Sequence, residues 1–148
     1  MIDYKAEVTV NVPAEKVFAA VTDEQKWSMW TPMQDTKVLV GSGFKEVGSQ
    51  VESVMVDSPG KPKLVFEVTA VEKNRRLSFK TISKSSIQWD GDFKLEPQGS
   101  SSTHLVSTGQ IRSSGLLKLM EFFMSGEIKK GEQKELEKLK ELLESNKM

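Results

Sequence analysis

Residues 6–32 read AEVTVNVPAEKVFAAVTDEQKWSMWTP, and this stretch decides the fold. Apolar and polar side chains alternate over residues 4–12, which is the period of a half-buried strand. Pro13 ends that strand and suits the first turn of a short helix, where its missing N–H is not needed. Thr22-Asp23 then has the character of a helix end followed by a new N-cap. A second short helix is therefore predicted, running to about Met29.

Downstream, the pattern changes to strand, turn, strand. Turn signals such as Asp57-Ser58-Pro59-Gly60 separate the apolar runs. The predicted strands cover residues 37–40, 49–56, 64–71, 77–82, 87–95 and 103–112. Together with the first strand they make seven short strands at regular spacing, which favours one antiparallel sheet.

The chain ends in a predicted long helix, capped by Ser113 or Ser114 and continuing to about Glu144. Its first half, residues 116–128, is apolar nearly all round. Its second half has a narrow stripe of leucines against alternating Glu and Lys. The sequence therefore predicts a long helix that lies across the concave face of the sheet.

Acidic and basic residues balance in the last part of this helix, from Glu127 to Lys147. Pairs such as Glu135 with Lys138 and Glu137 with Lys140 lie one turn apart and support a solvated helix. A basic helix that binds a membrane surface would not be balanced in this way. We therefore expect the charged face to be exposed to water.

Length and composition narrow the class of protein. The 148 residues favour one domain, spanning 1–148. There is no cysteine, which excludes disulfides, thiolate metal sites and a cysteine nucleophile. Lys plus Arg equals Asp plus Glu at 21 each, whereas a nucleic-acid-binding protein would show a basic excess. No secretory signal is seen, and no apolar run approaches the roughly 20 residues of a membrane span. We expect a cytoplasmic protein with no cofactor, no metal, no nucleic-acid partner and no integral membrane association; the oligomeric state stays open.

The predicted order of strand, two short helices, six strands and a long helix is that of the helix-grip fold. With the Pro-Ala-x-x-Val-Phe segment at residues 13–18 and the Trp-x-Pro turn at residues 30–32, the chain resembles the polyketide cyclase/dehydrase and lipid-transport (SRPBCC) superfamily. Its relatives include START lipid-transfer domains and the birch-pollen allergens. The resemblance implies an α+β fold: a seven-stranded antiparallel sheet wrapped around the long C-terminal helix, with an apolar cavity between them. It implies no reaction, because the superfamily mixes carriers, sensors, chaperone regulators and a minority of enzymes.

Candidate ligand contacts are the apolar and aromatic side chains expected to face that cavity. They are Trp30, Phe66, Trp89, Phe93, Leu117, Met120, Met124 and Ile128. For the helix residues the alternative is a filled core with no hole, although methionine is common at adaptable apolar surfaces. Trp30 could clamp a ligand at the cavity mouth or anchor its turn onto the sheet. For Trp27, exposure or anchoring is expected.

Polar candidates for chemistry are few. His104, the only histidine, begins a strand where exposure is expected, and nothing in the sequence marks a partner carboxylate. Asp90 and Asp92 share the strand face opposite Trp89, which favours a solvated outer face. If the tryptophan face were outside, both aspartates would point into the cavity. Arg112 could meet a ligand carboxylate or phosphate, or form an ordinary surface ion pair.

Three functional readings remain open at this point. The leading one is binding of a lipid, polyketide-like aromatic or isoprenoid for sequestration or transfer. The second is a polyketide cyclase or dehydratase, which would need a general acid or base in the cavity, most plausibly a buried carboxylate or His104. The third is a regulator that binds a protein partner, which predicts a small or absent cavity and an exposed apolar patch.

Overall fold

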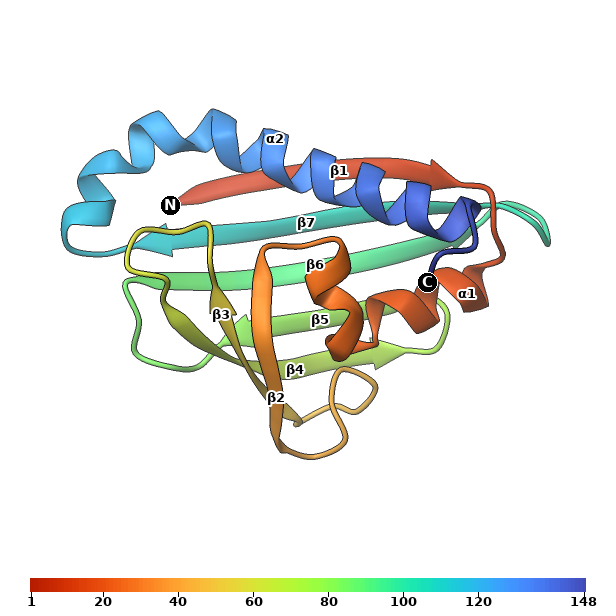
Figure 1. Cartoon of the computed structure of the whole chain (residues 1–148), viewed down its shortest axis with the longest axis horizontal. Helices are drawn as coiled ribbons and strands as arrows, with labels where there is room; N and C mark the ends of the chain where they lie inside the picture. Colours follow the sequence, from red (N-terminus) through yellow and green to blue (C-terminus); the bar gives the residue numbers. More distant parts are fainter.

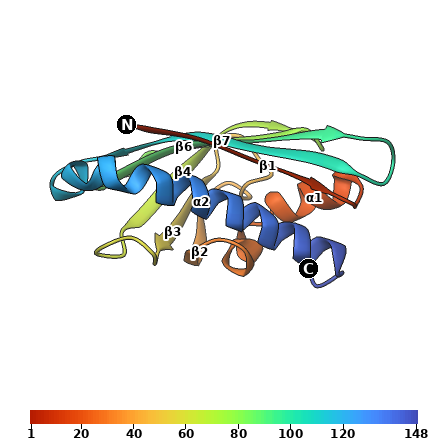
Figure 2. The ribbon, with the colours of Figure 1, turned by 90° about the horizontal axis from the view of Figure 1, so that it is seen from above.

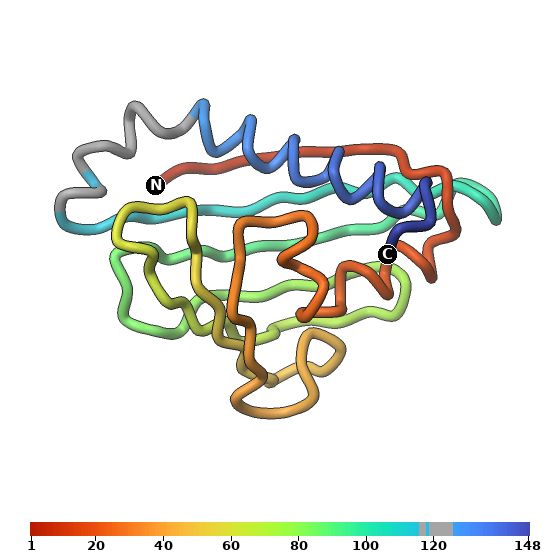
Figure 3. The backbone as a smooth tube through the Cα atoms, viewed as in Figure 1, coloured from red at the N-terminus to blue at the C-terminus, as the bar shows by residue number. Residues whose placement is uncertain are grey.

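The computed structural model describes residues 1–115, 118 and 126–148, and it has the predicted α+β architecture (Figure 1). In chain order the elements are β1 (Ile2–Val10), α1 (Ala14–Val21), the short 3-10 helix η1 (Glu24–Met29), β2 (Met33–Val40), β3 (Gln50–Met55), β4 (Lys63–Glu72), β5 (Arg76–Thr81), β6 (Ile87–Pro97), β7 (Thr103–Ser113) and α2 (Leu116–Glu144). Of α2, the described part is Lys118 and residues 126–144 (Figure 3).

All seven strands form one antiparallel sheet in the order β1-β7-β6-β5-β4-β3-β2, so β1 and β2 are its two edges. Seen from above, α1 and α2 lie on the same side of the sheet, and the end formed by β2 and β3 curls towards that side (Figure 2). The predicted helix-grip arrangement is therefore confirmed. The concave face holds the core, and the other face of the sheet is exposed.

The N-terminal segment folds as its sequence predicts. Pro13 is the extended N-cap of α1, and Thr22 ends this helix by donating its hydroxyl to the carbonyl of Phe18 at 2.7 Å. Asp23 then caps η1, accepting from the amide of Gln25 at 3.2 Å. Trp27 anchors η1, because its indole N–H donates to the Val21 carbonyl at 2.8 Å in the buried core. The two short helices are thus fixed over one end of the sheet.

Two boundaries differ from the prediction for a local reason. β2 begins at Met33, directly after Pro32, and not near residue 37. Its register with β3 shifts between Gln34 and Lys37, where Asp35 has a positive φ of 54°, and this irregularity breaks the alternation that marks a strand in sequence. The second difference is the start of α2, whose N-cap is Gly115 and not a serine.

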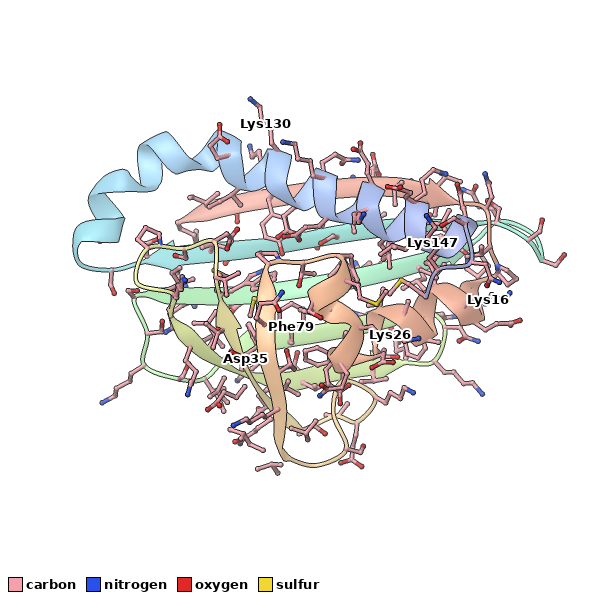
Figure 4. All side chains as sticks on the ribbon, in the orientation of Figure 1. Lys16, Lys26, Asp35, Phe79, Lys130 and Lys147 are labelled. Atoms are coloured by element: carbon pink, nitrogen blue, oxygen red, sulfur yellow. The ribbon has the colours of Figure 1, made fainter. Side chains whose placement is uncertain are left out.

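An aromatic cluster fills the concave face beneath α1 and η1. Phe79, labelled in Figure 4, lies at its centre, with ring centroids 5.1 Å from Trp89, 5.3 Å from Phe66 and 5.6 Å from Trp27. These three pairs meet edge to face, the arrangement that aromatic quadrupoles favour. Gly91 faces Phe79 across the strand pair, and a Cβ at this position would collide with the phenyl ring.

Polar side chains of α2 bind the free edge of β1, along which the helix runs (Figure 1). The Gln133 amide accepts from the Glu7 N–H at 3.3 Å and donates to the Glu7 carbonyl at 3.0 Å. Lys140 donates to the Thr9 carbonyl at 2.6 Å, and Glu144 accepts from the amide of the following loop residue, Asn11, at 2.7 Å. α2 therefore satisfies backbone groups that an edge strand would otherwise leave unpaired.

Candidate functional site: an acidic cavity beneath the long helix

A cavity of about 200 Å³ lies between α2 and the end of the sheet where β6 begins and β7 ends. The described residues that line it come from β2 and the residue before it, β3 and the loop after it, β6, β7 and α2. They are Pro32, Met33, Met55, Asp57, Ser58, Ile87, Trp89, Ile111, Ser113, Glu127, Ile128, Gly131, Glu132 and Glu135. Most of this wall is apolar, and its acidic residues come from α2 and the β3–β4 loop.

Glu132 and Glu135 belong to the cavity, which corrects the expectation that the whole charged face of α2 is solvated. Glu132 is buried, with 7% of its surface exposed, and Glu135 is half-buried where it borders the cavity. The expected pairing of Glu135 with Lys138 is therefore wrong. Lys140, which was expected to pair with Glu137, bonds to Glu144 at 2.6 Å. Lys130, by contrast, points away from the sheet (Figure 4).

The two glutamates retain a proton at neutral pH because of their surroundings. Burial raises the pKa of Glu132 above its ordinary value, although hydrogen bonding lowers it in part. Burial, followed by the negative charges of Glu132 and Asp57, raises the pKa of Glu135. Burial also raises the pKa of Asp57. Two close carboxyl groups cannot both ionise readily in such a site, so the pair shares a proton.

Tyr4 lies next to these acids, behind the cavity residue Trp89. The Trp89 indole N–H donates to the Tyr4 hydroxyl at 2.7 Å, and both side chains are buried. Burial, together with the charge of Glu132, raises the pKa of Tyr4 far above its ordinary value, so the phenol stays protonated. Gly109 makes room for this group, because a Cβ there would lie 2.5 Å from the Tyr4 hydroxyl.

One buried serine hydroxyl in the cavity wall has no hydrogen-bond partner among the described residues. Ser58 lines the cavity with 9% of its surface exposed. Ser107, with 1% exposed, does not line the cavity, and hydrogen bonding to it lowers the pKa of both Glu132 and Tyr4. Buried hydroxyls are nearly always bonded in folded proteins. The Ser58 hydroxyl is therefore available to a bound molecule.

The predicted contact residues occupy different places in the structure. Trp89 and Ile128 line the cavity. Trp30, Phe66 and Phe93 are buried in the aromatic core and are not part of the described cavity wall. Leu117, Met120 and Met124 lie outside the described residues. Their role as ligand contacts stays a prediction.

The polar candidates from the sequence lie on the outer face of the sheet. His104 is 3.1 Å from the Glu7 carboxylate, a partner that nothing in the sequence marked. Asp92 bonds to Arg76 at 2.8 Å and also to Ser78. Arg112 lies 3.7 Å from Asp90, which is the ordinary surface ion pair. These groups are separated from the cavity by the sheet itself.

The acids of α2 could have been found from helical spacing. Ile128, Glu132, Glu135, Leu139 and Leu142 follow one another at intervals of four, three, four and three residues, so they share one face of the helix. Because Leu139 and Leu142 are buried, the helix face that carries the two glutamates is turned towards the sheet. Tyr4, Asp57 and the serines carry no such signal, since they meet the glutamates only through the sheet and its loops.

Other kinds of site find no support in the described part of the chain. Within residues 1–115, 118 and 126–148, no group of three His, Asp or Glu side chains is placed to hold a metal ion. None of the helices, over the residues searched, is long and apolar enough to cross a membrane.

Comparisons with solved structures give the same fold. A protein of Thermus thermophilus superposes with a TM-score of 0.77 at 17% identity, covering 99% of both chains. A START superfamily protein of Mycobacterium smegmatis gives 0.68 at 16%, covering 93% of this chain and 98% of that one. The di-domain ARO/CYC protein BexL, from the BE-7585A biosynthetic pathway, gives 0.73 at 15%; the match covers 97% of this chain but 47% of BexL. No curated protein matches the sequence.

The family comparison covers nearly the whole chain. The model for "Polyketide cyclase / dehydrase and lipid transport" matches residues 1–144. Family and fold together support a role in binding hydrophobic ligands. The chain belongs to the polyketide cyclase/dehydrase and lipid-transport family.

Proposed function

We propose that this protein binds a hydrophobic or amphipathic small molecule in the cavity beneath α2, for sequestration or transfer. The observation that carries the proposal is a cavity whose wall is mostly apolar and whose polar side chains come mainly from α2 and the β3–β4 loop. Binding sites for small molecules are commonly built in this way, with apolar contact for affinity and a few polar groups for orientation. Family membership supports the same class of ligand.

The apolar wall can supply the binding free energy. Met33, Met55, Ile87, Ile111 and Ile128 surround the space with side chains that form no hydrogen bonds. Removing apolar ligand surface from water contributes roughly 25 cal/mol for each Å² buried. A cavity of about 150 Å³ lined by apolar side chains is known to take up benzene, so one of about 200 Å³ admits at least a small ring.

The first test is native mass spectrometry of the purified protein before and after solvent extraction. The proposal expects an added small-molecule mass that extraction removes. The extracted protein should then bind the neutral fluorescent probe N-phenyl-1-naphthylamine. A Met55→Trp variant should lose this binding because the indole fills the cavity, whereas Met29→Trp, at an exposed site, should keep it. Equal binding by both variants would contradict the assignment of the ligand to this cavity.

An acid/base enzyme is the second candidate, and the proton shared by Glu132 and Glu135 favours it. A carboxyl group that stays protonated near neutral pH can serve as a general acid, and its ionised neighbour can serve as a base. Incubation with polyketide-like aromatic precursors, followed by mass spectrometry of the products, tests this reading. Turnover should fall by at least about 100-fold in Glu132→Gln, within the range that acid/base groups contribute.

A protein-binding regulator receives less support. That reading requires a small or absent cavity, whereas the described residues enclose one with buried polar groups. The large exposed apolar side chains of the described chain are spread over several elements: Met1, Met29, Leu39, Val40, Val47, Val56 and Ile82. Scattered residues of this kind need no special explanation.

A further inference from the structure

We propose that the ligand is an organic cation, an amine with an apolar body, whose ammonium group binds to Glu132 and Glu135 while the body lies along Trp89. This inference rests on the proposed function, because it names the chemical class of the molecule that occupies the same cavity. It follows from the charge of the cavity wall, from the lack of basic side chains in that wall, and from the buried, unpartnered hydroxyl of Ser58.

The wall of the cavity carries one sign of charge. The described residues of this wall include the acids Asp57, Glu127, Glu132 and Glu135. No Lys, Arg or His is among the described residues that line the cavity. The sequence from 116 to 125 adds a single basic residue, Lys118, which is exposed. A cavity lined by acids concentrates cations and repels carboxylates. Fatty acids and other anionic lipids are therefore poor candidates for this site.

Acids elsewhere on the protein have partners that the cavity acids lack. Asp92 bonds to Arg76 at 2.8 Å, and Glu144 bonds to Lys140 at 2.6 Å. Over the described residues, neither Glu132 nor Glu135 has an ion pair with a basic side chain. A buried carboxylate is costly unless it is paired, and the pairing that the protein does not supply is left for the ligand.

An unpartnered hydroxyl is an independent sign of a bound group. Ser58 lines the cavity, is at least nine-tenths buried, and its hydroxyl has no hydrogen-bond partner among the described residues. An ammonium group has three donors and no acceptor. One oxygen from each of the two carboxyl groups and the Ser58 hydroxyl would accept all three N–H donors of the ammonium group.

The apolar neighbour of the acids suits a cation as well. Trp89 lines the same cavity, and an indole is the aromatic group that attracts cations best. The titratable groups around the pair come from three places: Asp57 from the β3–β4 loop, Glu127 of α2 in the same cavity wall, and the protonated phenol of Tyr4 from β1. Each is neutral or negative, so every one of them tolerates or favours a positive ligand.

Three probes with one apolar body test the inference: 3-phenylpropylamine, 3-phenylpropanol and 3-phenylpropanoate. Isothermal titration calorimetry at neutral pH measures the Kd of each with the extracted protein. The amine should bind at least about ten-fold more tightly than the alcohol, since hydrogen bonds between charged groups are stronger than those between neutral groups. The carboxylate should bind more weakly than either.

The variant Glu132→Gln/Glu135→Gln separates charge from shape. It should bind the amine at least about ten-fold more weakly and leave the Kd of the alcohol unchanged. Glu137→Gln is the matched control, because Glu137 lies on the same helix but is exposed. It should change neither Kd. Asp57→Asn gives a second variant on another element. It should weaken the binding of the amine and leave the Kd of the alcohol unchanged.

The outcomes distinguish two kinds of failure. Equal affinity for the amine and the alcohol, or tighter binding of the carboxylate, would overturn the cationic ligand and leave a hydrophobic binding site. Loss of amine affinity in Glu137→Gln equal to that in the double variant would also overturn it. If none of the three probes binds, the proposed function fails together with this inference.

Discussion

The two ends of the concave face are built in opposite ways. Beneath α1 and η1 the space is filled by aromatic rings around Phe79, and the Trp27 indole donates to a backbone carbonyl. Beneath the middle of α2 the space is hollow, with Glu132 in its wall and the buried Ser58 hydroxyl left without a partner among the described residues. The first end stabilises the fold, and the second sacrifices stability for a site. One sheet thus carries a closed core and an open pocket side by side.

The largest expected effect lies in the filled end. Phe79→Ala should lower the free energy of unfolding by about 3–5 kcal/mol, because it removes the ring at the centre of the aromatic cluster. Urea denaturation at neutral pH measures this loss. Ile82→Ala, at a half-exposed neighbouring position, should cost much less. A loss of under about 1 kcal/mol for Phe79→Ala would mean that the cluster does not hold this end together.

The next effect lies at the boundary between the two ends. Tyr4→Phe removes the hydroxyl that accepts from the Trp89 indole at 2.7 Å and leaves this buried N–H unpaired. The expected cost is about 1–3 kcal/mol, again by urea denaturation. Tryptophan fluorescence should change at the same time. An unchanged stability would indicate that the hydrogen bond contributes nothing to the fold.

The hollow end should respond to pH. Glu132 and Glu135 have folded-state pKa values above the ordinary 4.5, so above that pH the folded protein binds more protons than the unfolded chain. The free energy of unfolding should therefore fall as pH rises from about 4.5 towards neutral, by up to about 1.4 kcal/mol per pH unit for each extra proton held.

The same double variant used for binding tests this pH dependence. Glu132→Gln/Glu135→Gln should remove the slope and be more stable than the wild type above neutral pH. Denaturation curves between about pH 5 and pH 8 measure both quantities. Glu137→Gln, on the exposed face, should keep the wild-type slope. A double variant less stable than wild type throughout would contradict the view that this end sacrifices stability.

The smallest effect is expected outside the concave face. Arg76→Gln breaks the ion pair with Asp92, in which the arginine side chain is 40% exposed. Exposed pairs contribute about 0–1 kcal/mol and weaken in salt. The variant should therefore lie within about 1 kcal/mol of wild type, with a smaller difference in high salt. A larger loss would place a stabilising network on the outer face.

Prediction from sequence succeeded where a pattern repeats and failed where contacts are distant. Alternation and turn residues gave the seven strands, and the face opposite Trp89 was correctly assigned to Asp90 and Asp92. The balanced charges in the second half of α2 predict a solvated face, and they hide the inward position of Glu132 and Glu135, whose spacing follows the leucines. Tyr4 lies near these acids only because β1, the first strand of the chain, pairs with β7, the last strand. No local pattern encodes that meeting.

The bonds from α2 to β1 also determine where the sheet can grow. An edge strand is a template for pairing with another chain, and Gln133 and Lys140 occupy that template on β1. The other edge is β2, which the bulge at Asp35 distorts and which carries the exposed apolar residues Leu39 and Val40. Strand addition is therefore expected at β2, since α2 already occupies backbone groups of Glu7 and Thr9 on the β1 edge.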